Sequence, residues 1–268
     1  MPLVERRRHV LHYESIGDLA KPPVLLIMGL ALSSRAWDRL PELLASDFRV
    51  LVFDNVGTGK SARRGFAYRM RDLADDAAAV LDHAGVAAAH VFGISMGGMI
   101  AQELAIRHGE RVQSLALGCT FASWRKGKAP SLSTKLDLLL LNIGFATPAR
   151  IARVLVSAEW HAAHPDGTMQ WLRRAERTAL RFATAQVLAI ARHHALDRLS
   201  QIRAPTLVLT GSADRLVPPA NSVLLARSIP GARLRVLEGA GHVFPLEREE
   251  ETVRALREHF LGRAATQK

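Results

Sequence analysis

Short aliphatic runs alternate along most of the chain with longer stretches at helical period. The runs that predict strands are Val24–Met28, Arg49–Asp54, His90–Ile94, Ser114–Leu117, Thr206–Thr210 and Arg233–Leu237. The stretches that predict helices include Arg71–Ala84, Met96–His108, Asn221–Ser228 and Glu249–Leu261. Strands that alternate with helices favour a parallel sheet, so the pattern predicts an α/β fold with helices on both faces of a mostly parallel sheet. The segment His9–Glu14 alternates apolar and polar residues, which is typical of a half-exposed antiparallel edge strand.

One segment interrupts the alternation. Residues 121–198 show helical pattern and no convincing strand, so we expect a helical cap inserted into a core domain of residues 1–120 and 199–268. The insertion carries 12 Lys and Arg against 5 Asp and Glu, and so supplies 7 of the 11 net positive charges. Its run Leu138–Leu141 could line a pocket or cover the interface of a homodimer.

Composition places the chain among soluble globular proteins. It has 268 residues, of which 49% are hydrophobic and 23% charged. The single cysteine, Cys119, excludes an internal disulfide and is expected to be a small buried residue in a reducing compartment. The basic N-terminus has no apolar region behind it, and the longest apolar stretch, Val24–Leu32, has nine residues where a membrane span needs about 20. We therefore expect a cytoplasmic protein without stable membrane insertion.

The net charge of +11 raises the possibility of nucleic-acid binding. However, the basic residues are dispersed, and the one tight run, Arg6–Arg8, follows a glutamate. There is no zinc-finger spacing, aromatic-glycine strand motif or basic heptad arm. We therefore predict no nucleic-acid partner.

The most informative motif follows the predicted strand that begins at His90. Gly93-Ile94-Ser95-Met96-Gly97 is a G-x-S-x-G sequence between a strand and a helix, the context of a nucleophile elbow. Glycines two residues to either side let the two backbones approach closely while the turn exposes the serine hydroxyl. The start of the helix favours negative charge beside Ser95. Ser95 is the candidate nucleophile.

A serine nucleophile needs a base, and position eliminates most of the eleven histidines. His242 lies just beyond the carboxyl end of the last predicted strand, the edge at which open parallel sheets bind ligands. The histidines of the insertion, His161, His164, His193 and His194, are weaker candidates that we expect to be solvated or to line a pocket.

The base needs a carboxylate to orient it, and Asp214 follows the next-to-last predicted strand. Asp54 is the other acid at a strand end, whereas no acid closely follows the strand ending near Gly118. The order Ser95, Asp214, His242 along the chain is that of an α/β-hydrolase triad.

Acyl transfer also requires donors for the oxyanion, and backbone N–H groups suffice. We expect one from Met96, after the nucleophile, and a second from Leu30, in the loop after the first central strand. The substrate pocket is predicted to be apolar, with lining from the residues Met28, Trp37, Phe121, Trp124, Leu139 and Val243.

Taken together, these motifs resemble those of the α/β-hydrolase fold serine hydrolases over nearly the whole chain. The matching segments are MGL at Met28–Leu30, DNVGTGKS at Asp54–Ser61, GISMGG, GSAD and GAGH. Two positions depart from many relatives, which have His-Gly in place of Met28-Gly29 and Arg in place of Val56. The Met-Gly form is similar to a branch with polyketide methylesterases, such as aclacinomycin methylesterase, and enol-lactonase-like enzymes. The serine at the elbow argues against haloalkane dehalogenases and epoxide hydrolases, which have aspartate there.

The segment Gly57–Ser61 superficially resembles a phosphate-binding loop. That motif requires a glycine where this chain has Asp54, so a structural turn is the better interpretation. No spacing typical of a zinc site is present, and we predict neither a metal nor a cofactor.

The function predicted from these residues is hydrolysis of a small apolar carboxylic ester or lactone through an acyl-enzyme on Ser95. Three alternatives stay open at this point. A thioesterase would use the same triad, and its basic cap could bind an acidic acyl-carrier protein. A carbon–carbon bond hydrolase also shares the triad, and a ligand-binding protein could retain the fold without turnover.

Overall fold

The predicted mixed sheet is present in the computed structural model, which describes residues 3–6, 9–63, 68–142, 146–175 and 178–262. Nine strands of the described chain form the sheet, in the order β1-β2-β4-β3-β6-β7-β8-β9 with β5 paired to β2. Strand β2 runs antiparallel to β4, and the six neighbouring strands β4, β3, β6, β7, β8 and β9 are parallel. The strand bounds are β1 Leu3–Arg6, β2 His9–Ile16, β3 Pro23–Ile27, β4 Arg49–Phe53, β5 Ala62–Arg63, β6 Ala89–Ile94, β7 Val112–Gly118, β8 Thr206–Gly211 and β9 Arg233–Leu237.

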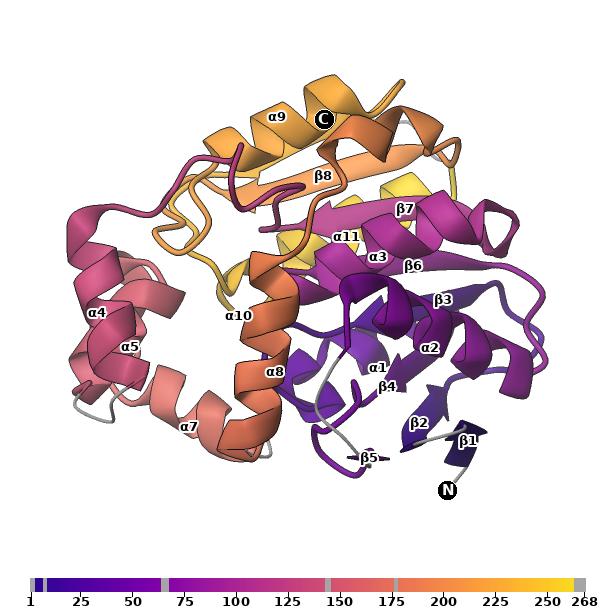
Figure 1. Cartoon of the computed structure of the whole chain (residues 1–268), viewed down its shortest axis with the longest axis horizontal. Helices are drawn as coiled ribbons and strands as arrows, with labels where there is room; N and C mark the ends of the chain where they lie inside the picture. The colour runs from indigo at the N-terminus through magenta and orange to yellow at the C-terminus, as the bar shows by residue number, and fades with distance from the viewer. Residues whose placement is uncertain (1–2, 7–8, 64–67, 143–145, 176–177, 263–268) are drawn as a thin grey trace.

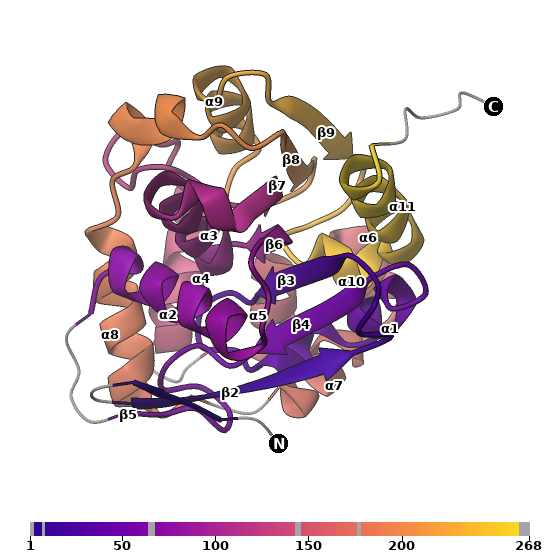
Figure 2. The ribbon, with the colours of Figure 1, turned by 90° about the vertical axis from the view of Figure 1, so that its right-hand side faces the viewer.

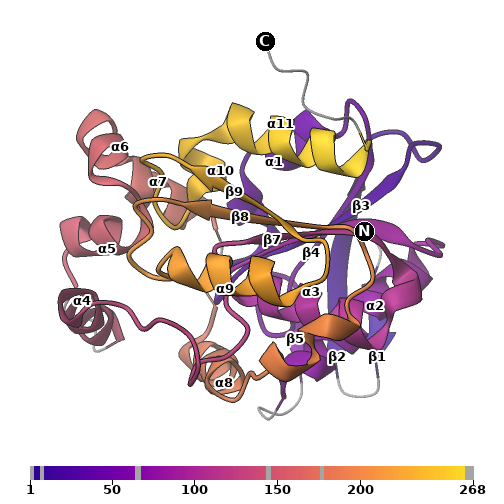
Figure 3. The ribbon, with the colours of Figure 1, turned by 90° about the horizontal axis from the view of Figure 1, so that it is seen from above.

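Two layers of helices cover the sheet (Figure 3). Helices α1 and α11 pack on one face, and α2, α3 and α9 pack on the other. The bounds of the helices outside the insertion are α1 Leu40–Leu44, α2 Met70–His83, α3 Met96–Arg107, α9 Ala220–Ser228, α10 Phe244–Glu247 and α11 Glu249–Phe260. Short 3₁₀ turns span Ser34–Trp37, Gly109–Arg111 and Leu196–Gln201. The predicted α/β architecture is confirmed, and helices α1 and α10 and strands β1 and β5 are additions to it.

Alternate residues of the central strands feed two separate cores, because successive side chains of a strand point to opposite faces. In β3, Leu25 and Ile27 pack with the helices of one face, whereas Val24 and Leu26 pack with those of the other. These four side chains are fully buried, as both faces of a covered parallel sheet require. The continuous aliphatic runs of the sequence follow from this double burial.

The amino-terminal edge of the sheet is built differently. Strands β1, β2 and β5 lie together at one edge, close to the N-terminus (Figure 2). In β2, His12 is buried as well as Leu11 and Tyr13, so burial does not alternate along this strand. The prediction of an antiparallel strand over His9–Glu14 is confirmed, but the prediction of a half-exposed edge strand is wrong, because β1 and β5 extend the sheet beyond β2.

The segment between β7 and β8 contains five helices in its described residues and no named strand. They are α4 Leu132–Asn142, α5 Pro148–Leu155, α6 Ala158–Ala163, α7 Gly167–Arg174 and α8 Leu180–Ala191. Helices α4, α5, α7 and α8 lie beyond the carboxyl ends of the strands (Figure 1). The buried Trp171 connects α7 to the 3₁₀ turn Ser34–Trp37, because its Nε1–H donates to the Ala36 carbonyl oxygen at 2.9 Å.

None of the helices in the described residues combines the length and hydrophobicity that crossing a lipid bilayer demands.

Candidate active site

Ser95 stands at the turn between β6 and α3, as the motif predicted. Its backbone has φ 52° and ψ −120°, a conformation that non-glycine residues rarely adopt. Several hydrogen bonds hold this strained turn. The Ser95 N–H donates to the Gly118 carbonyl at 2.9 Å, and the hydroxyl of Thr120 donates to the Ser95 carbonyl at 2.7 Å. The sheet thus fixes the serine from the neighbouring strand β7.

The two glycines of the motif are required by close backbone contacts. A Cβ atom at Gly93 would overlap the Gly97 carbonyl oxygen, and one at Gly97 would overlap the carbonyl oxygen of Ile27. Helix α3 can therefore start directly above β6 and beside β3 only with glycine at these positions. The physical reason given for the G-x-S-x-G spacing is present in the structure.

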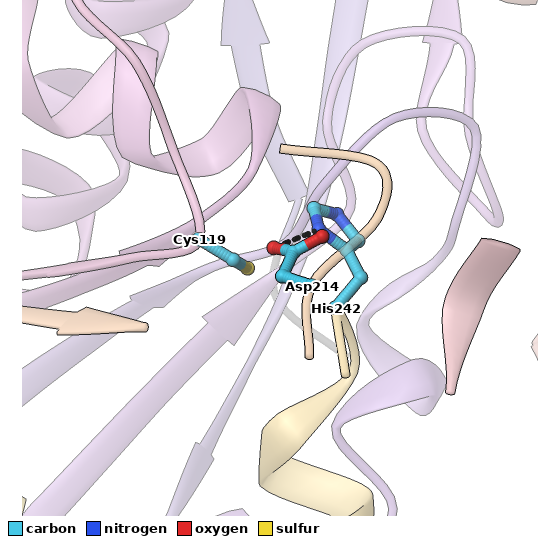
Figure 4. Close-up of side chains that lie close together, drawn as sticks. All are labelled: Cys119, Asp214 and His242. Atoms are coloured by element: carbon cyan, nitrogen blue, oxygen red, sulfur yellow. Dashed lines mark hydrogen bonds and ion pairs between the residues drawn. The ribbon is translucent and has the colours of Figure 1, made fainter. Parts of the chain in front are cut away.

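Asp214 and His242 meet at the carboxyl edge of the sheet, although 28 residues separate them (Figure 4). Asp214 follows β8, His242 follows β9, and the His242 Nδ1 lies 2.9 Å from Asp214 Oδ2. The other carboxylate oxygen, Oδ1, accepts the N–H groups of Leu216 and Val217, both at 2.9 Å. Both side chains are almost fully buried. Asp214 is therefore held with one oxygen directed at the imidazole.

This environment determines the charge of the imidazole. Burial lowers the pKa of His242, but the negative charge of Asp214 and the contact with Cys119 raise it by more. The pKa of His242 consequently lies well above its usual value. A carboxylate that stabilises the imidazolium in this way is what a general base needs when it accepts a proton.

Cys119 is a member of this cluster that the sequence did not reveal. It follows Gly118 at the end of β7, and its Sγ, a ring nitrogen of His242 and a carboxylate oxygen of Asp214 all lie within 4.8 Å of one another (Figure 4). Cys119 is buried, as expected, but it occupies the strand end at which no acid was found. Thiol, imidazole and carboxylate can together bind a soft divalent ion. Here hydrogen bonds already engage both oxygens of Asp214.

Cys119 also relates the serine to the histidine. Gly118, the residue before Cys119, accepts the hydrogen bond from the Ser95 N–H. The side chain of Cys119 itself lies close to His242. The ends of β6, β7, β8 and β9 therefore bring the three predicted residues to one edge of the sheet.

The loop after β3 passes directly over the nucleophile. A Cβ atom on Gly29 would lie 3.3 Å from Ser95 Cβ and 3.8 Å from Ser95 Oγ. Leu30 follows Gly29, and Met96 is the first residue of α3. Within the described part of the chain, neither the Leu30 N–H nor the Met96 N–H makes a hydrogen bond. Both of the predicted oxyanion donors thus belong to backbone beside Ser95.

Three side chains not singled out from the sequence support these loops. Gln186 of α8 accepts the Ala31 N–H at 2.7 Å, and Asn55 donates to the Met28 carbonyl at 2.9 Å. The buried Glu247 accepts the N–H of Gly241 through one oxygen and that of Ser157 through the other, both at 2.9 Å. Polar residues scattered along a sequence give no signal of such contacts.

An apolar cavity of about 230 Å³ opens beside the loop of Asp214. Phe121 and Trp124, two predicted pocket residues, line it together with Leu138, Leu216 and Val217. Because the N–H groups of Leu216 and Val217 donate to Asp214, the cavity adjoins the candidate catalytic acid.

The other predicted pocket residues have different surroundings. Met28, Trp37 and Val243 are buried in the core on the α1 and α11 side of the sheet. The ring of Trp37 lies 5.3 Å from that of Phe92. The side chain of Leu139 is not among those that the structure describes, and neither are the side chains of Leu140 and Leu141.

Asp54 has a structural role. Its Oδ1 accepts the Ser34 N–H at 2.7 Å and its Oδ2 accepts the Lys60 N–H at 2.9 Å. The hydroxyl of Ser61 donates to the Asp54 carbonyl at 2.7 Å. The segment Gly57–Ser61 is therefore a braced turn, in agreement with its interpretation from the sequence.

Comparison with known proteins supports the same fold and chemistry. Residues 22–249 match the family described as alpha/beta hydrolase fold. The rhodomycin D methylesterase DauP of a Streptomyces species is 33% identical over an alignment of 300 positions, which covers 98% of each chain. A putative carbamate hydrolase, RutD of Azorhizobium caulinodans, is 33% identical, with 87% of this chain and 88% of the relative covered.

Among solved structures, the enol-lactonase of Burkholderia xenovorans superposes with a TM-score of 0.83. It is 25% identical, and the match covers 95% of this chain and 97% of that one. The resemblance to methylesterases and enol-lactonases inferred from the motifs is confirmed by these similarities. The chain belongs to the alpha/beta hydrolase fold family.

Proposed function

We propose that this ester hydrolase cleaves carboxylic esters or lactones through an acyl-enzyme on Ser95, with His242 as general base and Asp214 as its orienting acid. The observation that carries the proposal is the buried hydrogen bond of 2.9 Å between Asp214 and His242. It lies at the same edge of the sheet as the strained turn of Ser95. The similarity to methylesterases, an enol-lactonase and a carbamate hydrolase supports acyl transfer as the reaction class.

The proposed reaction proceeds in two halves. The Ser95 hydroxyl attacks the carbonyl carbon while the Nε2 of His242 takes its proton, and a tetrahedral oxyanion forms. The N–H groups of Leu30 and Met96 donate to that oxyanion. The imidazolium then returns the proton to the leaving alcohol, and an acyl ester on Ser95 is left. Water, activated by the same histidine, hydrolyses this ester and restores the serine.

We assign the helices of residues 121–198 to a cap that shapes the substrate site. Gln186 on α8 supports this assignment, because it holds the loop of the proposed oxyanion donor Leu30 through Ala31. The apolar cavity between Phe121, Leu138 and Val217 is proposed to hold an apolar part of the substrate.

Initial rates on p-nitrophenyl esters from acetate to decanoate test the proposal, with Ser95→Ala as the matched variant. We expect wild-type hydrolysis, a fall of at least about 10³-fold in the variant, and an optimum chain length set by the apolar cavity. An acyl-pantetheine thioester included in the series separates a thioesterase from an esterase. Equal rates for wild type and Ser95→Ala would refute the assignment of Ser95.

A further inference from the structure

A second cavity lies on the side of the molecule where α8 ends. Its volume is about 530 Å³, and its lining is dominated by six basic residues, Arg69, Arg125, Lys126, Arg192, His193 and His194. They come from the start of α2, from the segment after β7 and from the end of α8. The insertion contributes five of the six, so part of its excess positive charge is concentrated around this cavity.

The positive charge of the cavity is only partly neutralised. No Asp or Glu is among the described residues that line it. Asp197 lies nearby and pairs with Lys126 at 3.2 Å and with His194 at 2.7 Å. In contrast, Arg125 and Arg192 form no ion pair with any described residue. Two guanidinium groups are therefore available to a ligand.

His193 gives the cavity a buried polar wall. Its side chain is only 1% exposed, and the Nδ1 has no hydrogen-bond partner in the described part of the chain. Glu103 Oε1 is 3.8 Å from that nitrogen, too far for a hydrogen bond, and both oxygens of Glu103 accept from Arg198. Burial lowers the pKa of His193 to about 4, so this imidazole is neutral and the positive charge around the cavity comes from its arginines and lysine.

This basic cavity is close to the proposed catalytic residues. The His193 Nε2 lies 3.4 Å from the Oε1 of Gln102, which stands six residues after Met96 on α3, or about 9 Å along the helix. The Gln102 side chain also donates to the Phe121 carbonyl at 3.2 Å. Ser123 lines both the basic cavity and the apolar cavity. The two cavities therefore meet at Ser123.

We propose that the basic cavity binds an anionic group, a carboxylate or a phosphate, carried by the substrate at the end remote from the scissile ester. The inference rests on the proposed ester hydrolysis at Ser95 and deepens it by naming a substrate class. The apolar part of the substrate occupies the cavity of Phe121 and Leu138 and crosses Ser123. The anion then lies between Arg125 and Arg192, with the imidazole of His193 behind it. Guanidinium groups suit both anions because they bind oxyanions through two parallel N–H groups.

The first test compares esters of equal length with and without a terminal charge. One pair is p-nitrophenyl hydrogen octanedioate and p-nitrophenyl octanoate, with the charge on the acyl side. The second pair is 8-acetoxyoctanoate and octyl acetate, with the charge on the alcohol side. We expect a preference of about tenfold or more in kcat/KM for the charged member of one pair, and a loss of that preference at 0.5 M salt.

The second test removes the two charges. In the double variant Arg125→Gln with Arg192→Gln, we expect kcat/KM for the charged ester to fall by at least about tenfold, while the rate on the neutral ester is retained. The double variant Arg227→Gln with Arg254→Gln, at exposed positions of α9 and α11, is the control for the same change in net charge. A phosphate-ended ester of the same length distinguishes a phosphate site from a carboxylate site.

The outcomes separate this inference from the proposed function. Hydrolysis of neutral esters with no preference for either charged ester would overturn the anion site and leave the esterase assignment intact. The same conclusion follows if the double variant slows both kinds of ester equally. Calorimetric titration of Ser95→Ala protein with monomethyl octanedioate measures the site independently of turnover. Equal affinity in the Ser95→Ala protein with and without the two arginine substitutions would also overturn it.

Discussion

Replacing Asp214 by Asn tests how the acid orients the proposed base. The substitution keeps the size of the side chain but replaces one acceptor oxygen by an NH₂ donor. The Leu216 and Val217 N–H groups both donate to Oδ1, so this position must remain an oxygen. The new NH₂ group therefore faces His242 Nδ1, which must give up its proton to accept a hydrogen bond. The proton of the neutral ring then resides on Nε2, where a base needs a lone pair.

The size of the effect follows from what it takes to restore the active tautomer. Rotating the amide would turn its NH₂ toward the two N–H groups and leave about two buried donors without an acceptor. At about 1–3 kcal/mol each, the penalty is about 2–6 kcal/mol, or roughly 30-fold to 10⁴-fold in rate. Loss of the carboxylate charge, which stabilises the imidazolium, adds to this penalty. We therefore expect kcat to fall toward the upper end, about 10⁴-fold, as for the same exchange in other serine triads.

The assay is kcat for a p-nitrophenyl ester, accompanied by the NMR signals of the imidazole nitrogens of His242. The wild type should show the proton of the neutral ring on Nδ1, and Asp214→Asn should show it on Nε2. The thermal midpoint should change little, because the amide retains the hydrogen bonds of the loop. A kcat within tenfold of the wild type, with the tautomer switched, would refute the reasoning that Asp214 acts through His242.

Three further predictions concern Gly97, the protonation of His242 and Trp171. Gly97→Ala should destabilise the protein by about 3 kcal/mol and abolish turnover, because its Cβ would overlap the Ile27 carbonyl. The control Gly109→Ala has no atom within 4 Å of the added methyl group. It should leave the free energy of unfolding, measured in urea, and the turnover rate unchanged. The raised pKa of His242 predicts that kcat/KM increases with pH and reaches half its maximum above pH 6.5, since only the neutral imidazole accepts the serine proton. A pH-rate profile with its midpoint below about 6 would contradict this prediction. Trp171→Phe leaves a buried carbonyl without its donor, and urea unfolding should show a loss of about 1–3 kcal/mol.

The parallel core was predictable from the sequence because its strands are buried on both faces. A run such as Val24–Ile27 must be apolar at every position, which marks it as a strand between two helical layers. Strands β1 and β5 have no such constraint, since they are short and lie at the polar edge of the sheet. Helix α1, with five residues and a proline in its first turn, is too short to show a period.

The candidate residues Ser95, Asp214 and His242 were predictable because each lies within a few residues of the carboxyl end of a strand, in a recognisable local motif. Cys119 also follows a strand, but its proximity to Asp214 and His242 depends on β7 and β8 pairing side by side. No local pattern indicates that pairing. Glu247 has the same character, since it joins the loop before His242 to Ser157 across 90 residues. Contacts between distant segments are a property of packing and not of the local sequence.

The central claim is that Ser95 is the nucleophile activated by His242, and covalent labelling tests it most directly. The protein would be treated with a fluorophosphonate, and the adduct located by mass spectrometry of its peptides. We expect one adduct, on Ser95, no labelling of Ser95→Ala, and labelling at least about 10³-fold slower in His242→Ala. An adduct on another residue, or undiminished labelling of the Ser95→Ala protein, would contradict it.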